Sequence, residues 1–391
     1  MAPTPLTPNL ANAGFSNQTV RNIVYTSVGG GALRVRISNT YGTSALNLGS
    51  VTVGAELTGS QLVPGTVHQV TFGHQASVTL AAGAQTVSDP VSMRVFPKEN
   101  LAISLYLPTA TGPATYHSGA QQTNYVASGD QAGQVSGAAY TTTATSWYFV
   151  DEVDVRSASI PGTVVAFGDS ITDGAASQVG ANDRWPNYLA RRLDAAFGAR
   201  APGVVDEGIG GNRVLNDSPC FGVNALARLN RDVLSVTGAK DVILLEGIND
   251  IGFSQVSPGP NNTSVGPGGS AALPFGCFSP NTNVSAAQIE QGYQEIISAA
   301  HAHGLTIFGG TLTPFKGSFY WSPAAEVKRE AVNNWIRISH AFDGVIDFEK
   351  AVQNRFDPLY MDPAYNSGDN LHPNDAGYEA MGNAINLAFL K

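Results

Sequence analysis

The sequence has few charged side chains, and it has no basic cluster. Charged residues make up 13% of the 391 residues, and the formal net charge is -9, whereas about 25% charged residues is usual for a soluble protein. A protein that binds the phosphate backbone of a nucleic acid gathers Lys and Arg on one segment or face, and no segment here does so. The composition therefore argues against nucleic acid as a partner. It favours a folded, secreted, strand-rich protein.

Long hydrophobic runs are also missing. No apolar stretch approaches the roughly 18 residues of a membrane-spanning helix, so no membrane span is predicted. Residues 1–10 do not combine a charged segment with an apolar one, as a signal peptide would. We expect a secreted or extracytoplasmic protein whose signal peptide has been removed, with a cytosolic start as the alternative.

Cysteine is scarce, with two residues in the whole chain. Cys220 and Cys277 both lie in irregular segments rich in Gly, Pro and Asn, where a disulfide of an exported protein commonly joins loops. We expect a Cys220–Cys277 disulfide, with two free thiols as the alternative. The sequence has no cluster of Cys, His and carboxylate residues typical of a metal site, and it has neither a phosphate-binding loop nor a dinucleotide motif. No metal and no cofactor are therefore expected.

The first part of the chain alternates apolar and polar residues in short runs. Leu33–Ile37 and Leu101–Tyr106 are two examples, and Gly or Pro residues separate such runs up to about residue 157. A period of two with regular turns is typical of antiparallel strands. We predict an antiparallel β-sandwich domain, resembling a jelly roll, over residues 1–158.

Beyond Pro161 the pattern becomes an apolar strand, a Gly-rich turn and a segment of helical period, repeated. It predicts a doubly wound α/β domain with a five-stranded parallel sheet over residues 159–391. The expected strands are 163–167, 203–206, 241–245, 305–308 and 344–348, and the expected helices are 183–197, 225–236, 286–303, 323–342 and 375–390. The segment 253–283 is expected to be irregular, because it is rich in helix breakers.

Residues that could carry chemistry follow the ends of the predicted strands, where ligands of an open parallel sheet bind. Ser170 follows the first strand, Gly211 the second and Asn249 the third. Asp369 and His372 lie three residues apart before the last helix. A serine becomes a nucleophile when an imidazole takes its proton, and a carboxylate orients that imidazole. We therefore expect Ser170, His372 and Asp369 to be catalytic.

Hydrolysis of an ester also needs donors for the oxyanion that forms during the reaction. The expected donors are the N–H of Ser170, the N–H of Gly211 and the side-chain amide of Asn249. An α/β-hydrolase nucleophile turn would read Gly-x-Ser-x-Gly, and no serine in the chain has Gly at both positions. That alternative enzyme class is therefore not supported.

These segments resemble, in order, the four sequence blocks of the SGNH (GDSL-type) hydrolase superfamily: Gly168-Asp169-Ser170, Gly211, Gly247-Ile248-Asn249-Asp250 and Asp369-Asn370-Leu371-His372. The resemblance covers residues from Thr163 to the C-terminus and implies a flavodoxin-like domain and a serine esterase that uses no cofactor. The β-rich first part resembles a two-domain secreted branch, some members of which are associated with xylan breakdown. An acylated carbohydrate is therefore one expected substrate class.

The polar segment 253–283 should border the active site, and it lacks the contiguous apolar stripe of a lid or acyl tunnel. It therefore favours short acyl groups, acetyl above all. A lipase for longer chains and an acyltransferase would use the same residues and remain alternatives. A catalytically inert carbohydrate-binding protein is the alternative from a different class.

Overall fold

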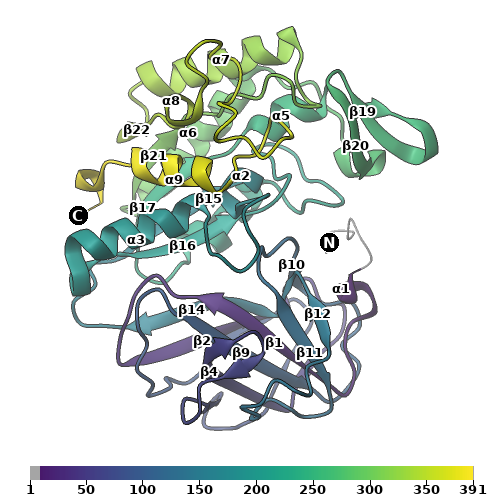
Figure 1. Cartoon of the computed structure of the whole chain (residues 1–391), viewed down its shortest axis with the longest axis vertical. Helices are drawn as coiled ribbons and strands as arrows, with labels where there is room; N and C mark the ends of the chain where they lie inside the picture. Colours follow the sequence, from purple (N-terminus) through teal and green to yellow (C-terminus); the bar gives the residue numbers. More distant parts are fainter. Residues whose placement is uncertain (1–8, 391) are drawn as a thin grey trace. The chain divides into compact units, whose positions relative to one another are not determined.

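The computed structural model describes residues 9–390, without the side chains of residues 270–272. The chain divides into two compact units, the first ending at Ile160 and the second beginning at Pro161. In Figure 1 the first unit consists mainly of strands, and the second alternates strands with helices. The division falls where the hydrophobic periodicity of the sequence changes.

The first unit is built from antiparallel strand pairs. The larger sheet contains β12 (Thr142–Ala144), β11 (Asn124–Ser128), β1 (Gln18–Tyr25), β9 (Asn100–Leu107), β4 (Ser50–Thr58) and β5 (Gln61–Leu62) in that order, with β6 (His68–Val70) paired to β4. A second sheet contains β14 (Val150–Arg156), β2 (Ala32–Ser38) and β8 (Gln85–Val87). The remaining elements are the pairs β3 (Leu46–Leu48) with β7 (Val78–Leu80) and β10 (Tyr116–His117) with β13 (Trp147–Tyr148), and the short helix α1 (Leu10–Ala13).

One hydrophobic core joins these sheets. Leu33, Val35 and Ile37 alternate along β2 and are buried, and they share a cluster with Val51 and Val53 of β4 in the larger sheet. Residues of period two on one face of a strand enter the same core. The predicted antiparallel β domain is therefore confirmed.

The second unit contains a five-stranded parallel sheet, as predicted. Its order is β16 (Gly203–Gly208), β15 (Thr163–Gly168), β17 (Ala239–Leu245), β21 (Thr306–Gly310) and β22 (Gly344–Ile346). This is the flavodoxin-like order 2-1-3-4-5, whose ligand site lies beside the first and third strands. Gly168 pairs with Gly208 on one side and with Leu245 on the other, so these three strands end at the same level.

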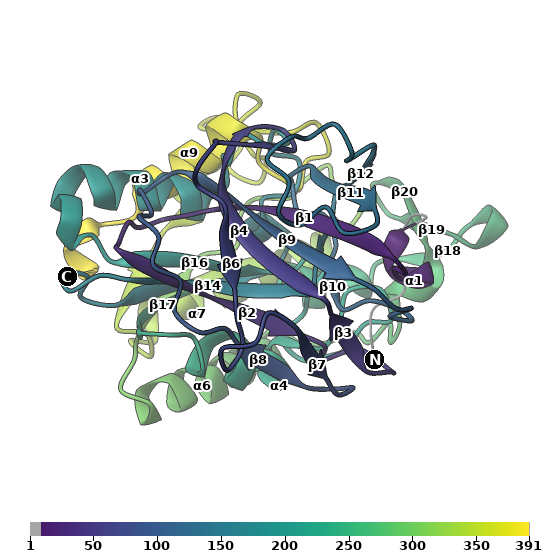
Figure 2. The same ribbon diagram turned by 90° about the horizontal axis from the view of Figure 1, so that it is seen from below.

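Helices pack in two groups. The long helix α3 (Trp185–Phe197) packs with α9 (Asp375–Ala384), whereas α6 (Ala286–Ala302) packs with α4 (Ala225–Leu229) and α7 (Pro323–Ile338). In Figure 2 the two groups lie on opposite sides of β16 and β17. The short helices α2 (Ser170–Asp173), α5 (Ile248–Phe253) and α8 (Phe348–Val352) each begin just after a strand. They are too short to produce a helical period in the sequence.

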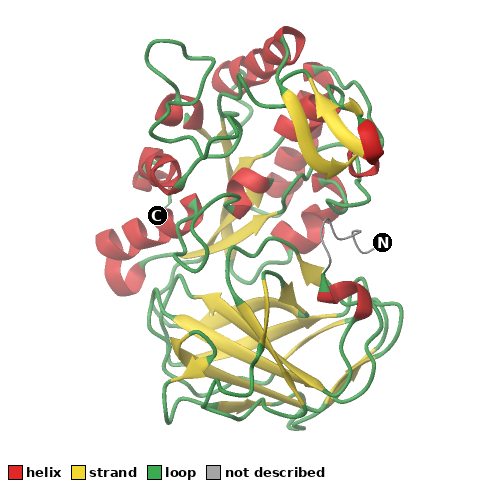
Figure 3. Ribbon diagram, turned by 45° about the vertical axis from the view of Figure 1, so that its right-hand side comes forward, coloured by secondary structure: helices red, strands yellow, loops and turns green. Residues whose placement is uncertain are grey.

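The expectation that 253–283 is irregular was wrong. This segment forms a small antiparallel sheet of β18 (Ser257–Pro258), β19 (Thr263–Gly266) and β20 (Gly269–Pro274), which Figure 3 shows apart from the central sheet. Gly266 pairs with Gly269, so two residues close the hairpin. Glycine-rich strands carry no apolar alternation, and the sequence pattern therefore gave no signal of them.

No helix within residues 9–390 is long and apolar enough to span a bilayer. Over the same residues, no three His, Cys, Asp or Glu side chains lie together in a group that could hold a metal ion.

Candidate active site

The strand register brings three of the sequence-predicted residues to one edge of the parallel sheet. Ser170, Gly211 and Asn249 come two to four residues after the aligned ends of β15, β16 and β17. At Gly208, a Cβ atom would lie 2.1 Å from the amide nitrogen of Asp173. Glycine therefore lets α2 pack directly over the end of β16.

Ser170 is held at the start of α2. The side chain of Asp169 caps the helix by accepting a hydrogen bond from the Ile171 N–H at 2.9 Å. The left-handed Gly174, at φ 83°, ends the helix after a single turn. The first N–H groups of a helix have no acceptor within it, and the Ser170 N–H is one of these.

His372 and Asp369 reach Ser170 from the loop before α9. The Oγ of Ser170 lies 2.8 Å from Nε2 of His372, and Nδ1 of His372 lies 2.6 Å from Oδ2 of Asp369. The other carboxylate oxygen, Oδ1, accepts hydrogen bonds from the N–H groups of Leu371 and His372, both at 2.8 Å. The carboxylate thus orients the imidazole and also shapes the loop that carries it.

The electrostatics of this pair keep Asp369 ionised. Partial burial would raise the pKa of the Asp369 carboxyl, but hydrogen bonds and charge attraction from His372, together with the N–H of Leu371, hold that pKa far below its usual range. The Asp369 side chain is 47% exposed, against 18% for His372.

Gly211 lies in the loop that follows the end of β16. It has a left-handed φ of 73°, and a Cβ atom here would lie 2.3 Å from the ring of Phe221. Both features require glycine. Within residues 9–390, neither its N–H nor that of Ser170 donates to another group of the chain.

The Asn249 amide is held at both ends. Its Nδ2 donates to the carbonyl of Asn212 at 2.9 Å, and its Oδ1 accepts from the Tyr320 hydroxyl at 3.1 Å. An amide nitrogen carries two hydrogens, so one N–H of Asn249 remains for a ligand. Burial raises the pKa of Tyr320 well above its usual value, and the phenol therefore stays a donor.

Comparison with known families now identifies the chain. The GDSL-like Lipase/Acylhydrolase family matches residues 166–380, which is more than half of the chain and includes every residue of this site. The chain belongs to this family. It is an esterase-type hydrolase whose first unit lies outside the matched range.

Solved structures with a similar fold are distant from this acylhydrolase. An acetylxylan esterase from Geobacillus stearothermophilus is 19% identical with a TM-score of 0.40, covering 57% of this chain and 91% of that one. A GDSL-like lipase from Bacteroides thetaiotaomicron is 18% identical with a TM-score of 0.38, covering 58% and 87%. An α/β hydrolase from the metagenome of Lake Arreo is 21% identical with a TM-score of 0.41, covering 59% and 95%. No curated protein sequence matches the chain.

Asp250 supports the loop that follows Gly211. Its carboxylate accepts hydrogen bonds from the N–H groups of Val214 and Leu215, at 2.7 and 3.1 Å, and so ties the loop after β16 to α5. Burial raises the pKa of Asp250 to about 6, against the effect of these hydrogen bonds and of Arg213. Asp250 belongs to the Gly247-Ile248-Asn249-Asp250 block, and nothing in the sequence indicates which loop its side chain holds.

A buried charge cluster lies beneath the Ser170 turn. The Arg228 guanidinium is fully buried and donates to the carbonyl of Gly168 at 2.8 Å, while its Nη2 lies 3.6 Å from the Glu246 carboxyl. Burial raises the pKa of Asp169, and burial together with the nearby Asp169 raises that of Glu246. Arg228 opposes both shifts. The cluster therefore anchors the end of β15, two residues before Ser170.

The expected disulfide between Cys220 and Cys277 is present. The hydroxyl of Ser218 also donates to the Cys277 carbonyl at 2.6 Å. Beside the disulfide, the rings of Phe221 and Phe253 pack edge to face, with centroids 5.7 Å apart. The bond thus ties the loop that contacts Gly211 to the 253–283 insertion.

Proposed function

We propose that the chain hydrolyses carboxylic esters through an acyl intermediate on Ser170. The observation that carries the proposal is the continuous hydrogen-bonded chain from Asp369 through His372 to the Ser170 hydroxyl, with distances of 2.6 and 2.8 Å. A nucleophile, a base and a group that orients the base are the three parts that acyl transfer to serine requires.

In the first half of the reaction, Ser170 Oγ attacks the ester carbonyl while Nε2 of His372 takes its proton. The imidazolium then gives this proton to the departing alkoxide, leaving an acyl-serine. In the second half, His372 takes a proton from water, and the hydroxide attacks the acyl carbonyl. The bond to Ser170 Oγ then breaks, the imidazolium returns its proton to that oxygen, and the carboxylic acid leaves. Asp369 keeps the Nδ1–H tautomer and stabilises the imidazolium through the short hydrogen bond.

The tetrahedral intermediate places negative charge on the former carbonyl oxygen. We assign its donors to the N–H of Ser170, the N–H of Gly211 and the remaining Nδ2–H of Asn249. In known hydrolases each such donor contributes about 2.7–4 kcal/mol of transition-state stabilisation.

The proposed specificity is for esters of short acyl groups, acetyl above all. The insertion 253–283 contributes no large exposed hydrophobic side chain among its described residues, and Phe253 and Phe278 are buried. A lid or tunnel for a long chain would need contiguous apolar surface, because burial contributes only about 0.8 kcal/mol per methylene. Hydrolysis rather than transfer is proposed, with an acyltransferase as the alternative from the same site.

The alcohol part of the substrate is proposed to be a carbohydrate, and residues 1–158 to be an accessory domain to the catalytic residues 159–391. The solved acetylxylan esterase is one protein of similar fold that acts on such a substrate. The Cys220–Cys277 disulfide supports an extracytoplasmic location, where such bonds persist.

Replacing Ser170 with Ala tests the assignment. The variant should lose about 10⁶-fold in kcat on nitrophenyl acetate, because the remaining donors can accelerate only attack by water. An organophosphate should label Ser170 in the wild type. A variant that keeps a tenth of the turnover would show that another group is the nucleophile.

A series of nitrophenyl acetate, butyrate, octanoate and palmitate tests the acyl specificity. An optimum of kcat/KM at octanoate or beyond would contradict the proposal.

A further inference from the structure

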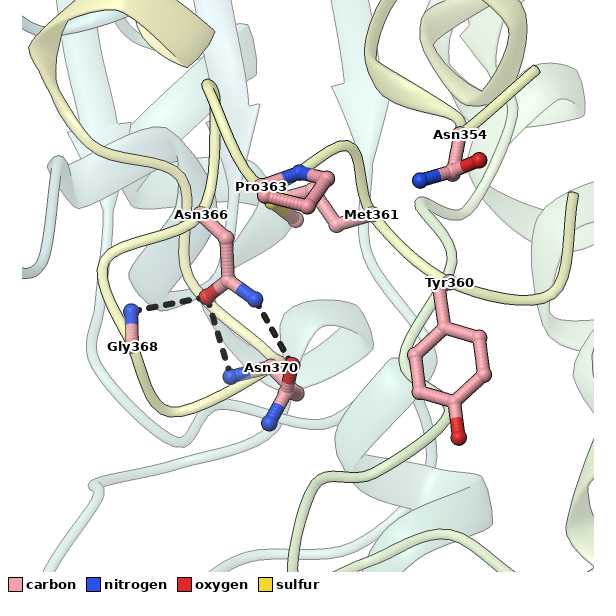
Figure 4. A pocket seen from close by; sticks show the side chains of 7 residues that line it. All are labelled: Asn354, Tyr360, Met361, Pro363, Asn366, Gly368 and Asn370. Carbon is pink, nitrogen blue, oxygen red and sulfur yellow. Dashed lines mark hydrogen bonds between the residues drawn. The ribbon is translucent and has the colours of Figure 1, made fainter. Parts of the chain in front are cut away.

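A cavity of about 410 Å³ lies beside the loop that carries Asp369. Its wall includes Gly368 and Asn370, the two neighbours of Asp369 in the sequence. The full lining is Asn354, Tyr360, Met361, Pro363, Asn366, Gly368 and Asn370. In Figure 4, Asn354 and Tyr360 lie on one side of this space, and Asn366, Gly368 and Asn370 lie on the other. A volume of about 300–1,000 Å³ is usual for small-molecule sites.

One side of the cavity is preorganised by its own hydrogen bonds. Asn366 donates from Nδ2 to the Oδ1 of Asn370 at 2.7 Å, and its own Oδ1 accepts from the N–H of Gly368 at 2.8 Å (Figure 4). These bonds fix the orientation of both amides. The second hydrogen on each amide nitrogen is available to a ligand.

The other side presents two polar groups that have no hydrogen-bond partner in the described part of the chain. The Oδ1 of Asn354 accepts from the N–H groups of Phe356 and Asp357. Within residues 9–390, its Nδ2 and the hydroxyl of Tyr360 form no hydrogen bond. Tyr360 is 36% exposed, which is high for a large aromatic side chain and leaves part of its ring open to a ligand.

The lining carries no formal charge. A cation beside the cavity, Lys316, lies 4.7 Å over the ring of Tyr360, and it is paired with Asp357 at 2.9 Å. A phosphate or an ammonium ligand would require an unpaired opposite charge. Amides, which both donate and accept, match hydroxyl groups, and an aromatic ring suits the apolar face of a sugar.

We propose that this cavity is a subsite for the uncharged sugar units of an acylated carbohydrate. Its lining includes both sequence neighbours of Asp369, on the loop that also carries His372. This inference rests on the proposed ester hydrolase, since it names the alcohol part that the same site accepts.

A binding experiment tests the subsite without turnover. Xylotriose, cellotriose and maltotriose are titrated into full-length Ser170→Ala by calorimetry. At least one should bind, and adding Tyr360→Ala should weaken it about tenfold. Asn354→Asp keeps the Oδ1 that caps the following turn but removes the amide donor, and should weaken binding roughly three- to tenfold.

Phe356→Ala is the matched control, because Phe356 is an 82% exposed ring on the same segment that does not line the cavity. It should bind as Ser170→Ala does. Failure of all three sugars to bind, or equal binding by the Tyr360→Ala and Phe356→Ala proteins, would overturn the subsite.

Kinetics separate this inference from the proposed function. In the enzyme with Ser170 intact, kcat/KM is measured on acetylated xylooligosaccharide and on nitrophenyl acetate. Tyr360→Ala should lower the ratio of the first value to the second about tenfold, mainly through KM. An unchanged ratio would overturn the subsite and leave the esterase intact. If wild-type protein hydrolyses neither substrate, the proposed function fails, whereas the sugar titrations still report on the subsite.

Discussion

The two sides of the candidate site are fixed in different ways. Ser170, Gly211 and Asn249 follow the ends of neighbouring parallel strands, and Ser170 and Asn249 are 7% and 2% exposed. Asp369 and His372 lie on a loop outside the central sheet, and the Asp369 side chain is 47% exposed. The strand side is therefore positioned by the fold, and the loop side by its own hydrogen bonds.

This difference has consequences for substitutions. A change on the loop side can remove one function while the loop keeps its shape, because short-range bonds such as that from the Leu371 N–H to Asp369 persist. A change on the strand side also removes hydrogen bonds between buried groups of different elements. Asn249, for example, is hydrogen-bonded to both Asn212 and Tyr320. Stability and activity should separate on the loop side and change together on the strand side.

Among changes that keep the Ser170 nucleophile, the largest expected effect is on the loop side. Asp369→Asn should lower kcat about 10⁴-fold, because the amide nitrogen would face Nδ1 and impose the tautomer whose Nε2 cannot accept the Ser170 proton. The amide oxygen can still accept from Leu371 and His372, so the melting temperature should change little. Steady-state kinetics and calorimetry measure both. Less than a tenfold loss of kcat would show that Asp369 does not orient the base.

On the strand side, Asn249→Ala should lower kcat about 10²- to 10³-fold. The change removes an oxyanion donor and leaves the Asn212 carbonyl and the Tyr320 hydroxyl without their partner. A boronic acid that mimics the tetrahedral intermediate should bind correspondingly more weakly. If kcat fell while boronate affinity stayed at the wild-type value, Asn249 would not be an oxyanion donor.

Asp250 should make stability depend on pH. Its pKa of about 6 in the folded state lies above the ordinary 3.8, so the folded protein binds the proton more tightly. Its contribution to stability is therefore greatest below about pH 4, falls as pH rises to about 6, and is lower by about 3 kcal/mol above that. Asp250→Asn does not titrate there.

Urea unfolding at pH 4, 5, 6 and 7 measures this effect. The stability of wild type relative to Asp250→Asn should decline across the series. A difference independent of pH would mean that the folded and unfolded states share one pKa at Asp250.

The smallest expected effect concerns Tyr320, which contacts Asn249 but not the reacting atoms. Tyr320→Phe should lower kcat about tenfold with little change in KM, because the Asn249 amide loses the hydrogen bond that fixes its orientation. Tyr378→Phe is the matched control, since this buried hydroxyl donates to the Ala175 carbonyl at 2.7 Å. Equal loss of kcat in both variants would indicate a general structural effect.

The sequence by itself determined the two fold classes and the residue types of the site. A period of two up to residue 157 and repeated strand–turn–helix units beyond Pro161 predict the two classes of fold, because burial on one face or both leaves a local pattern. Ser170, Asn249 and the Asp369–His372 pair stand at predicted strand ends or before a helix, where local pattern suffices to find them. The disulfide between Cys220 and Cys277 followed from having only two cysteines in irregular sequence.

Only the tertiary structure decided which groups support that site. The bond from Tyr320 to Asn249 joins residues 71 positions apart, and that from Asp250 to Val214 joins residues 36 apart. Such contacts leave no periodicity, since either residue alone could serve any buried polar role. The same holds for the small sheet within 253–283 and for the cavity at Tyr360, which arise when chain segments without a local apolar pattern pack together. Local sequence records burial and turns, whereas the partners of a side chain depend on how distant elements meet.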